Sequence, residues 1–169
     1  MTSNNRDKAQ NILKLAGVTE SPVDIVMVAK ALNIKVVPYD FPDKRRGMVY
    51  LDETIKVIGV NKNNPQNLQR FTIAHELGHY LNGHAHYDSV YTENEKFKFA
   101  DAHFQQEKEA DLFAAELLMP KEFLIKDLDT IGLDIKKLTE KYQVSEQAMH
   151  IRLSSLGLID KYAQRKNTD

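Results

Sequence analysis

Residues 75–79 read His-Glu-Leu-Gly-His and are the stretch of this chain best suited to chemistry. On a helix, His75 and His79 project from one face, one turn apart, so both imidazole rings can reach one metal ion. Glu76 lies about 100° further round the helix, where it can contact a water molecule bound to that ion. Two ligands and a general base on one turn are the arrangement of a metalloprotease. The alternative interpretation is an amphipathic helix that carries two incidental histidines.

The sequence around this motif predicts a helix over residues 65–82. Asn64 is a favourable N-cap, Pro65 suits the first helical position, and Gly83 is a typical stop. Apolar residues recur at helical spacing beside the histidines, and they are Leu68, Phe71, Ala74, Leu77 and Leu81. This apolar stripe predicts that the helix packs against another element next to its metal-binding face.

A second predicted helix supplies a third ligand. A catalytic zinc ion usually takes three protein ligands and leaves one position open. Residues 105–120 have high helix propensity, and the small residues Ala110 and Ala114 share one face, so the histidine helix can approach it closely. Glu107, one turn before these alanines, then meets both histidines at the metal. Glu109 is the competing ligand, although it points elsewhere on the helix.

Asp111 lies one turn after Glu107 and is expected to accept the free ring N–H of a ligating histidine, which fixes the tautomer of that ligand. The alternative for both carboxylates is a solvated helix surface. That alternative is less favourable, because acidic residues one turn apart repel each other without a nearby cation. The chain has no cysteine, which excludes a disulfide scaffold and a thiolate zinc site and leaves histidine and carboxylate ligands.

The connection over residues 83–104 shows no clear periodicity, and loops of this length are often functional. Its histidines are expected to be exposed polar residues rather than ligands, and they are His84, His86 and His103. One of these histidines, or a nearby tyrosine, could hydrogen-bond a transition-state oxyanion. The tyrosines concerned are Tyr80, Tyr87 and Tyr91. The sequence does not choose among these side chains.

Composition excludes several classes of protein. The 169 residues are 42% hydrophobic, which suits one compact domain with a small appended lobe. Lys and Arg number 23 and Asp and Glu 24, so no net charge favours nucleic acid or a membrane surface. Residues 1–7 lack the apolar core of a signal peptide, and no run approaches the roughly 20 apolar residues of a membrane span. We therefore expect a soluble, cytoplasmic protein.

Scaffold elements precede the motif. Residues 6–16 predict a helix that Gly17 ends, and a second helix begins at Ser21-Pro22 and stops at Asn33. The β-branched and aromatic segments 34–41, 46–51 and 55–60 predict a small antiparallel meander, in which Pro38 indicates an edge or a strand end. An edge strand beside the metal helix could hold an extended substrate by strand addition, or it could simply face solvent.

The tail predicts further helices over 121–128, 134–142 and 145–156, with Ser145 as N-cap and Gly157 as stop, and a frayed polar end over 160–169. The break at Gln143-Val144 resembles a helix-turn-helix. Side chains that could then face DNA are Gln147, His150 and Arg152. We prefer packing, or docking of a repressor substrate, as the role of these helices, because the acidic residue Glu146 begins the helix that would have to read DNA.

With both motifs described, the chain resembles the ImmA/IrrE family of metallo-endopeptidases from about Ile12 to Ile159. The residues that carry the resemblance are 75–79 together with Glu-Lys-Glu-Ala-Asp-Leu-Phe-Ala-Ala-Glu-Leu-Leu-Met-Pro over 107–120. The resemblance implies a zinc-dependent endopeptidase inside bacterial cells, with His75, His79 and Glu107 as ligands and Glu76 as catalytic base. It also implies a helix-turn-helix repressor of a mobile element or stress regulon as substrate.

The resulting prediction is one α+β chain, mainly helical and zincin-like, with a three-stranded antiparallel sheet. Residues 1–120 form the peptidase core, and residues 121–169 form a helical region packed on it. Zn²⁺ is the expected metal, with Mn²⁺ as the alternative. The alternative function is a non-catalytic regulator that binds DNA or a repressor, or an antitoxin-like partner protein; direct DNA binding is the less favoured of these contacts.

Overall fold

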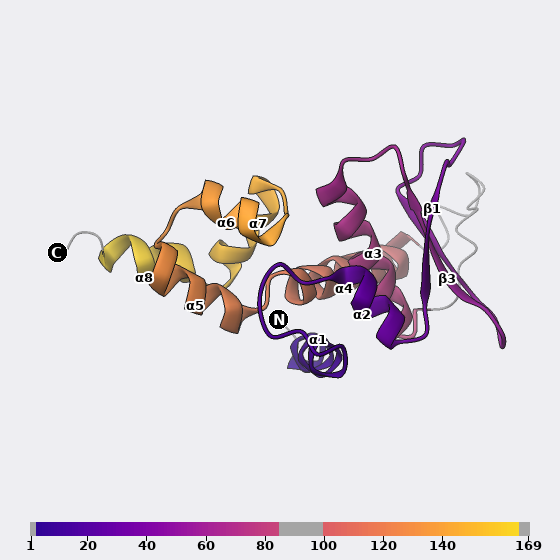
Figure 1. The fold of residues 1–169 in the computed structure, drawn as a ribbon, viewed down its shortest axis with the longest axis horizontal. Coiled ribbons are helices and arrows are strands. Elements are labelled where there is room, and N and C mark those ends of the chain that lie inside the picture. The colour runs from indigo at the N-terminus through magenta and orange to yellow at the C-terminus, as the bar shows by residue number, and fades with distance from the viewer. Residues whose placement is uncertain (1–2, 85–99, 166–169) are drawn as a thin grey trace.

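A computed structural model describes residues 3–84 and 100–165 of the chain. Its elements are α1 (Ser3–Leu15), α2 (Ile25–Ala31), β1 (Lys35–Tyr39), β2 (Gly47–Leu51), β3 (Lys56–Asn61), α3 (Gln66–Leu81), α4 (Ala100–Leu118), α5 (Lys121–Ile131), α6 (Ile135–Tyr142), α7 (Glu146–Ser155) and α8 (Leu158–Arg165). Figure 1 shows the strands at one end, α3 and α4 in the middle, and α5–α8 at the other end. Helices dominate and one small sheet accompanies them, so the predicted α+β class is confirmed.

The strands form one mixed sheet in the order β1-β3-β2. β3 pairs parallel with β1 and antiparallel with β2. The predicted purely antiparallel meander is therefore wrong, because a meander would place β2 between its neighbours in sequence. Residues 40–46 carry the chain across to the far side of β3 instead. The strand that takes the centre is the most buried one, and its Ile58 and Val60 are 0% and 2% exposed.

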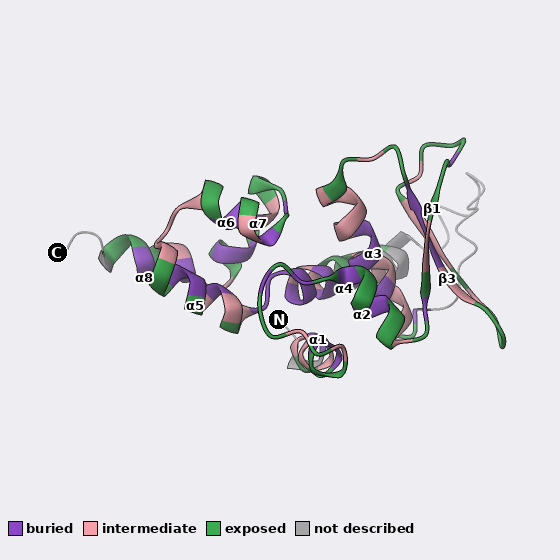
Figure 2. Cartoon of the chain, in the orientation of Figure 1, coloured by how far each residue is buried: buried purple, intermediate pink, exposed green. Residues whose placement is uncertain are grey.

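Helices α3 and α4 cross closely, and this contact positions the candidate site. A Cβ atom built on Gly78 would lie 3.0 Å from both the Cα and the carbonyl oxygen of Ala110, and 3.3 Å from the Cβ of Phe113. Ala110 and Ala114 are both 0% exposed, in keeping with the small-residue face predicted for this helix. Figure 2 shows buried residues along the inner parts of these helices and exposed or half-exposed residues along the sheet margins.

The ends of α3 agree with the predicted range to within one residue, although the cap differs. Pro65 itself occupies the N-cap position, and no side chain caps the helix there, so the prediction of Asn64 as N-cap is wrong. At the other end Gly83 has φ +64°, a conformation that favours glycine, and its N–H donates to the carbonyl of Tyr80. Similarly, α2 begins at Ile25 rather than at the predicted Ser21-Pro22, because Asp24 caps it through bonds to two backbone N–H groups.

The C-terminal helices differ from the prediction at the very end of the chain. Residues 158–165 form a helix rather than a frayed tail, because Leu158 and Tyr162 are buried at 3% and 5% exposure. The hydroxyl of Tyr162 also donates to Asp129 at 2.7 Å. The division of the chain at residue 120 stays a prediction. Across the described residues, none of the helices combines the length and the apolar character needed to cross a bilayer.

Arg152 does not face outward towards DNA. It is 2% exposed, and its guanidinium makes two bonds to the carboxylate of Glu116, at 2.9 and 2.6 Å. Its Nε also donates to the carbonyl of Met119 at 3.0 Å. The protein tolerates this buried charge because a carboxylate on α4 binds the guanidinium through two hydrogen bonds. The residue therefore joins α7 to the end of α4, so it takes the packing role rather than the less favoured DNA-facing one.

Candidate metal centre

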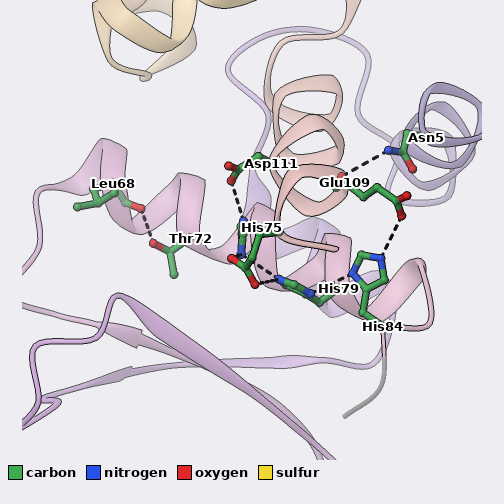
Figure 3. Close-up of polar contacts among 9 residues, drawn as sticks. Asn5, Leu68, Thr72, His75, His79, His84, Glu109 and Asp111 are labelled. Carbon is green, nitrogen blue, oxygen red and sulfur yellow. Dashed lines mark hydrogen bonds and ion pairs between the residues drawn. The ribbon is translucent and has the colours of Figure 1, made fainter. Parts of the chain in front are cut away.

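The structure brings His75, His79 and Glu107 together across the α3–α4 contact. The Nε2 atom of His75 lies 3.3 Å from one carboxylate oxygen of Glu107, and Nε2 of His79 lies 3.2 Å from the other. The two Nε2 atoms are 3.0 Å apart. Figure 3 shows the two imidazole rings turned towards one point between the helices. This convergence follows from the four-residue spacing on α3 and from the close approach at Gly78.

The donor set fits a metal ion. One ligand atom from each of the three residues lies within 4.8 Å of the other two, which is close enough for all three to share one ion. Two imidazoles and one carboxylate are a catalytic zinc set that leaves one coordination position open. The side chains are accessible from solvent, since 17% of His75, 16% of His79 and 42% of Glu107 is exposed.

Electrostatics in the metal-free site agree with this geometry. Burial lowers the pKa of His75, but hydrogen bonds to Asp111 and Glu107 outweigh it and raise that pKa to about 9. Hydrogen bonds from His75 and His79 hold the pKa of the Glu107 carboxyl well below its usual value. The site is therefore built around positive charge at its centre, whether protons or a metal ion supply that charge.

Asp111 lies behind the first histidine. Its carboxylate is 2.9 Å from Nδ1 of His75, on the side of the ring opposite the Glu107 contact. When Nε2 binds a metal ion, the proton of the neutral ring is on Nδ1 and is donated to Asp111. This is the contact that the sequence predicts for a residue one turn after the third ligand.

Glu76 is half-buried beside the histidines, on the same turn of α3. Burial raises the pKa of its carboxyl, and the nearby charges of His75 and His79 oppose that rise. Gly47, at the start of β2, allows the sheet to come close here. A Cβ atom on Gly47 would lie 2.5 Å from Cγ2 of Thr72 and 3.8 Å from Oε1 of Glu76.

Two residues have a place that the sequence did not predict. Glu109, the competing ligand in the sequence, contacts His84 instead, with 3.2 Å between its Oε2 and the Nε2 of His84. His84 is 8% exposed, so the expectation that it is an exposed residue is wrong. Its Nδ1 lies 3.0 Å from Nδ1 of His79, away from the Nε2 atoms of the centre. The sequence feature that could have indicated this contact is Gly83-His84 directly after the metal helix, because it places a histidine in the turn that ends that helix.

Among the remaining candidates, the structure describes only the side chain of Tyr80, which contacts the sheet. The hydroxyl of Tyr80 accepts a hydrogen bond from Lys56 of β3 at 2.9 Å. Three candidates fall outside the described side chains, namely His86, Tyr87 and Tyr91, and the side chain of His103 is likewise not described.

Comparison with known proteins supplies a family and a fold. A model of the IrrE N-terminal-like domain, a peptidase family, matches residues 29–154. The chain is 30% identical over 102 residues to "Uncharacterized immunity region protein 2" of Bacillus phage phi105, a match that covers 60% of each chain. A solved structure titled "Mycobacterium tuberculosis transcriptional regulator" shares the fold with a TM-score of 0.68 at 20% identity. That match covers 90% of this chain and 47% of the regulator. This chain thus spans less than two thirds of the phage protein and about half of the regulator.

Proposed function

Because the chain belongs to the IrrE N-terminal-like peptidase family, we propose that it is a zinc-dependent endopeptidase that cleaves a helix-turn-helix repressor. The observation that carries this proposal is the convergence of two imidazole Nε2 atoms and one carboxylate, with Glu76 on the same turn as the histidines. Three such ligands and an adjacent base are the parts that metal-assisted peptide hydrolysis requires.

Each side chain has a defined task in this reaction. A bound zinc ion would lower the pKa of a water molecule towards about 7 and polarise the scissile carbonyl. Glu76 takes the proton of the attacking water and passes it to the leaving amine, a role that suits a carboxyl whose pKa is raised by burial. Asp111 keeps the His75 ring in the tautomer that presents Nε2.

Strand β2 is the proposed docking edge for the substrate. It lies at one side of the sheet, and Gly47 brings its first residue close to Thr72 and Glu76. An extended segment that pairs with β2 would therefore run past the proposed base, and its main-chain hydrogen bonds would supply affinity without a demand on sequence. Side-chain contacts elsewhere on the surface would then select the repressor.

A repressor is the proposed substrate class because two similar proteins have names connected with gene control. One is named for a phage immunity region, and the other is titled a transcriptional regulator. The ImmA/IrrE resemblance of the two motifs implies the same class. A helix-turn-helix repressor encoded next to this chain is therefore the first substrate to test.

The test compares Glu76→Gln with wild type, using co-expression with the neighbouring repressor and measurement of bound metal. The variant should keep its zinc and lose cleavage, because Gln can neither take up nor return the proton. Glu140→Gln, at an exposed position on α6, is the matched control and should cleave normally. Full cleavage by Glu76→Gln would refute the assigned base. Repressor binding without cleavage by wild type would favour the non-catalytic regulator instead.

A further inference from the structure

The turn after the metal helix places His84 directly behind His79. The N–H of Gly83 donates to the carbonyl of Tyr80 at 3.2 Å, and the N–H of His84 donates to the carbonyl of His79 at 3.1 Å. These two bonds are the Schellman arrangement, in which the second residue beyond the cap folds back over the last turn. An apolar contact usually accompanies this turn. Here the contact is between two imidazole rings, with centroids 5.0 Å apart.

The hydrogen bonds through these rings allow one consistent set of protons. With Nε2 of His79 directed at the metal, the proton of that ring is on Nδ1, which donates to Nδ1 of His84 at 3.0 Å. The proton of His84 is then on Nε2, which donates to the carboxylate of Glu109 at 3.2 Å. Figure 3 shows this line of side chains, from His79 through His84 to Glu109.

Helix α1 holds the surroundings of this line in place. Lys8 donates to the carbonyl of Leu81 at 3.1 Å and to the side chain of Asn82 at 2.8 Å, so it fixes the end of α3. His84 is itself buried at 8% exposure, which leaves its ring little freedom to turn away. A ring that is buried, hydrogen-bonded at both nitrogens and held by its own backbone can orient its neighbour.

We propose that His84 is a positioning residue for the metal ligand His79, and that Glu109 fixes the His84 ring in turn. The two ligating histidines then have separate outer supports, Asp111 for His75 and the His84–Glu109 pair for His79. Outer supports of this kind commonly change metal affinity about 10- to 100-fold. This inference rests on the metal centre of the proposed function.

The experiment measures zinc affinity of the full chain by competition with a chromophoric chelator, in the absence of substrate. His84→Phe keeps a ring of similar size but accepts no hydrogen bond, and it should weaken zinc binding about tenfold or more. His84→Asn keeps an acceptor near the position of Nδ1 and should recover part of that affinity. Glu109→Ala should give a smaller loss than His84→Phe. His150→Asn, at an exposed position on α7, is the matched control and should bind zinc as wild type does.

A second readout separates positioning from packing. The visible spectrum of the Co²⁺-loaded protein should change in His84→Phe, since the orientation of the His79 ring changes, and it should return towards wild type in His84→Asn. Unchanged zinc affinity in His84→Phe overturns the inference, as does an equal loss in His84→Asn and His84→Phe. A lower melting temperature of the metal-free variant at unchanged affinity also overturns it. If His84→Phe does not fold, His84→Asn and Glu109→Ala still decide through their affinities.

The outcomes distinguish this inference from the proposed function. If wild type cleaves the repressor and the His84 variants bind zinc as wild type does, the peptidase proposal is supported and the positioning role of His84 is refuted. If the His84 variants lose zinc affinity as expected but wild type cleaves no repressor, the peptidase proposal is refuted and the positioning role is supported. A wild-type chain that binds no zinc removes both.

Discussion

Gly78→Ala tests whether the contact between α3 and α4 sets the geometry of the metal centre. The new Cβ would lie 3.0 Å from two backbone atoms of Ala110. Carbon atoms pack best at about 3.5–4.0 Å, so the helices must separate by roughly 0.5–1 Å. Backbone atoms of a helix cannot rotate away as the end of a flexible side chain can. The separation therefore has to be taken up by the whole of α4.

Two opposing effects set the change in stability. Overpacking of a tight contact costs about 1–3 kcal/mol, and replacement of glycine by alanine inside a helix returns about 1 kcal/mol, so the net loss should be about 0–2 kcal/mol. Metal binding should suffer more clearly. Glu107 is carried by α4, and a functional site tolerates displacements of only about 0.5 Å. We expect zinc affinity to fall about tenfold or more.

Chemical denaturation of the metal-free protein measures the first quantity and chelator competition measures the second. Ser154→Ala, at an exposed helical position on α7, is the control and should change neither by much. A variant that gains about 1 kcal/mol of stability and binds zinc as tightly as wild type would show that helix propensity alone acts at Gly78. Adding Ala110→Gly should give no rescue, because the close contacts are to backbone atoms.

Four further predictions concern other contacts. Arg152→Met should lower the free energy of unfolding, measured by urea denaturation, by about 3–5 kcal/mol, because the Glu116 carboxylate stays buried without its partner. Adding Glu116→Leu should recover much of that loss. Asp111→Ala should weaken zinc binding about 10- to 100-fold, and an unchanged affinity in chelator competition contradicts the assigned contact to His75. In the metal-free protein the pKa of His75 is about 9, raised from 6.5 by hydrogen bonds to Asp111 and Glu107 that outweigh burial. Zinc must therefore displace this proton, so the apparent affinity should rise about tenfold per pH unit up to about pH 9, and calorimetry in two buffers should detect the released proton. The stabilisation from protonated His75 is complete below pH 6.5 and lost as the pH rises through about 9, which thermal melts of metal-free protein should show.

Local signals predicted the helices well, because helix ends depend on a few neighbouring residues. Ser145 caps α7 by accepting the N–H of Ala148 at 3.1 Å, as its residue type indicates. The exceptions at the starts of α2 and α3 are also local. Pro65 takes the cap position itself and Asn64 is displaced outward by one residue.

Sheet order and the fate of the last residues could not be predicted in the same way. Hydrophobic alternation predicts that a segment is a strand, but it does not predict which strand pairs with it. The central place of β3 therefore depends on how residues 40–46 cross the sheet. Arg152 and Tyr162 look like surface residues in sequence. Their burial depends on Glu116 and Asp129, which lie more than 30 positions away.

In the candidate site, too, contacts made within regular helices were predictable and a contact made outside them was not. Helical spacing and the small residues of α4 were sufficient to select Glu107 over Glu109, and the structure places Glu107 between the histidines. Its role as a ligand, like those of His75 and His79, stays a prediction. The contact of His84 was missed, because it is made in a turn beyond the helix, where facing arguments based on helical period no longer apply.

The two outer strands of the sheet are chemically unequal. β1 contains Pro38, which has no N–H, and proline on an outer strand discourages a further chain from joining there. β2 has an N–H on all 5 of its residues. Among the described residues the sheet can therefore grow cleanly in one direction only, and that direction is the side on which Gly47 meets α3.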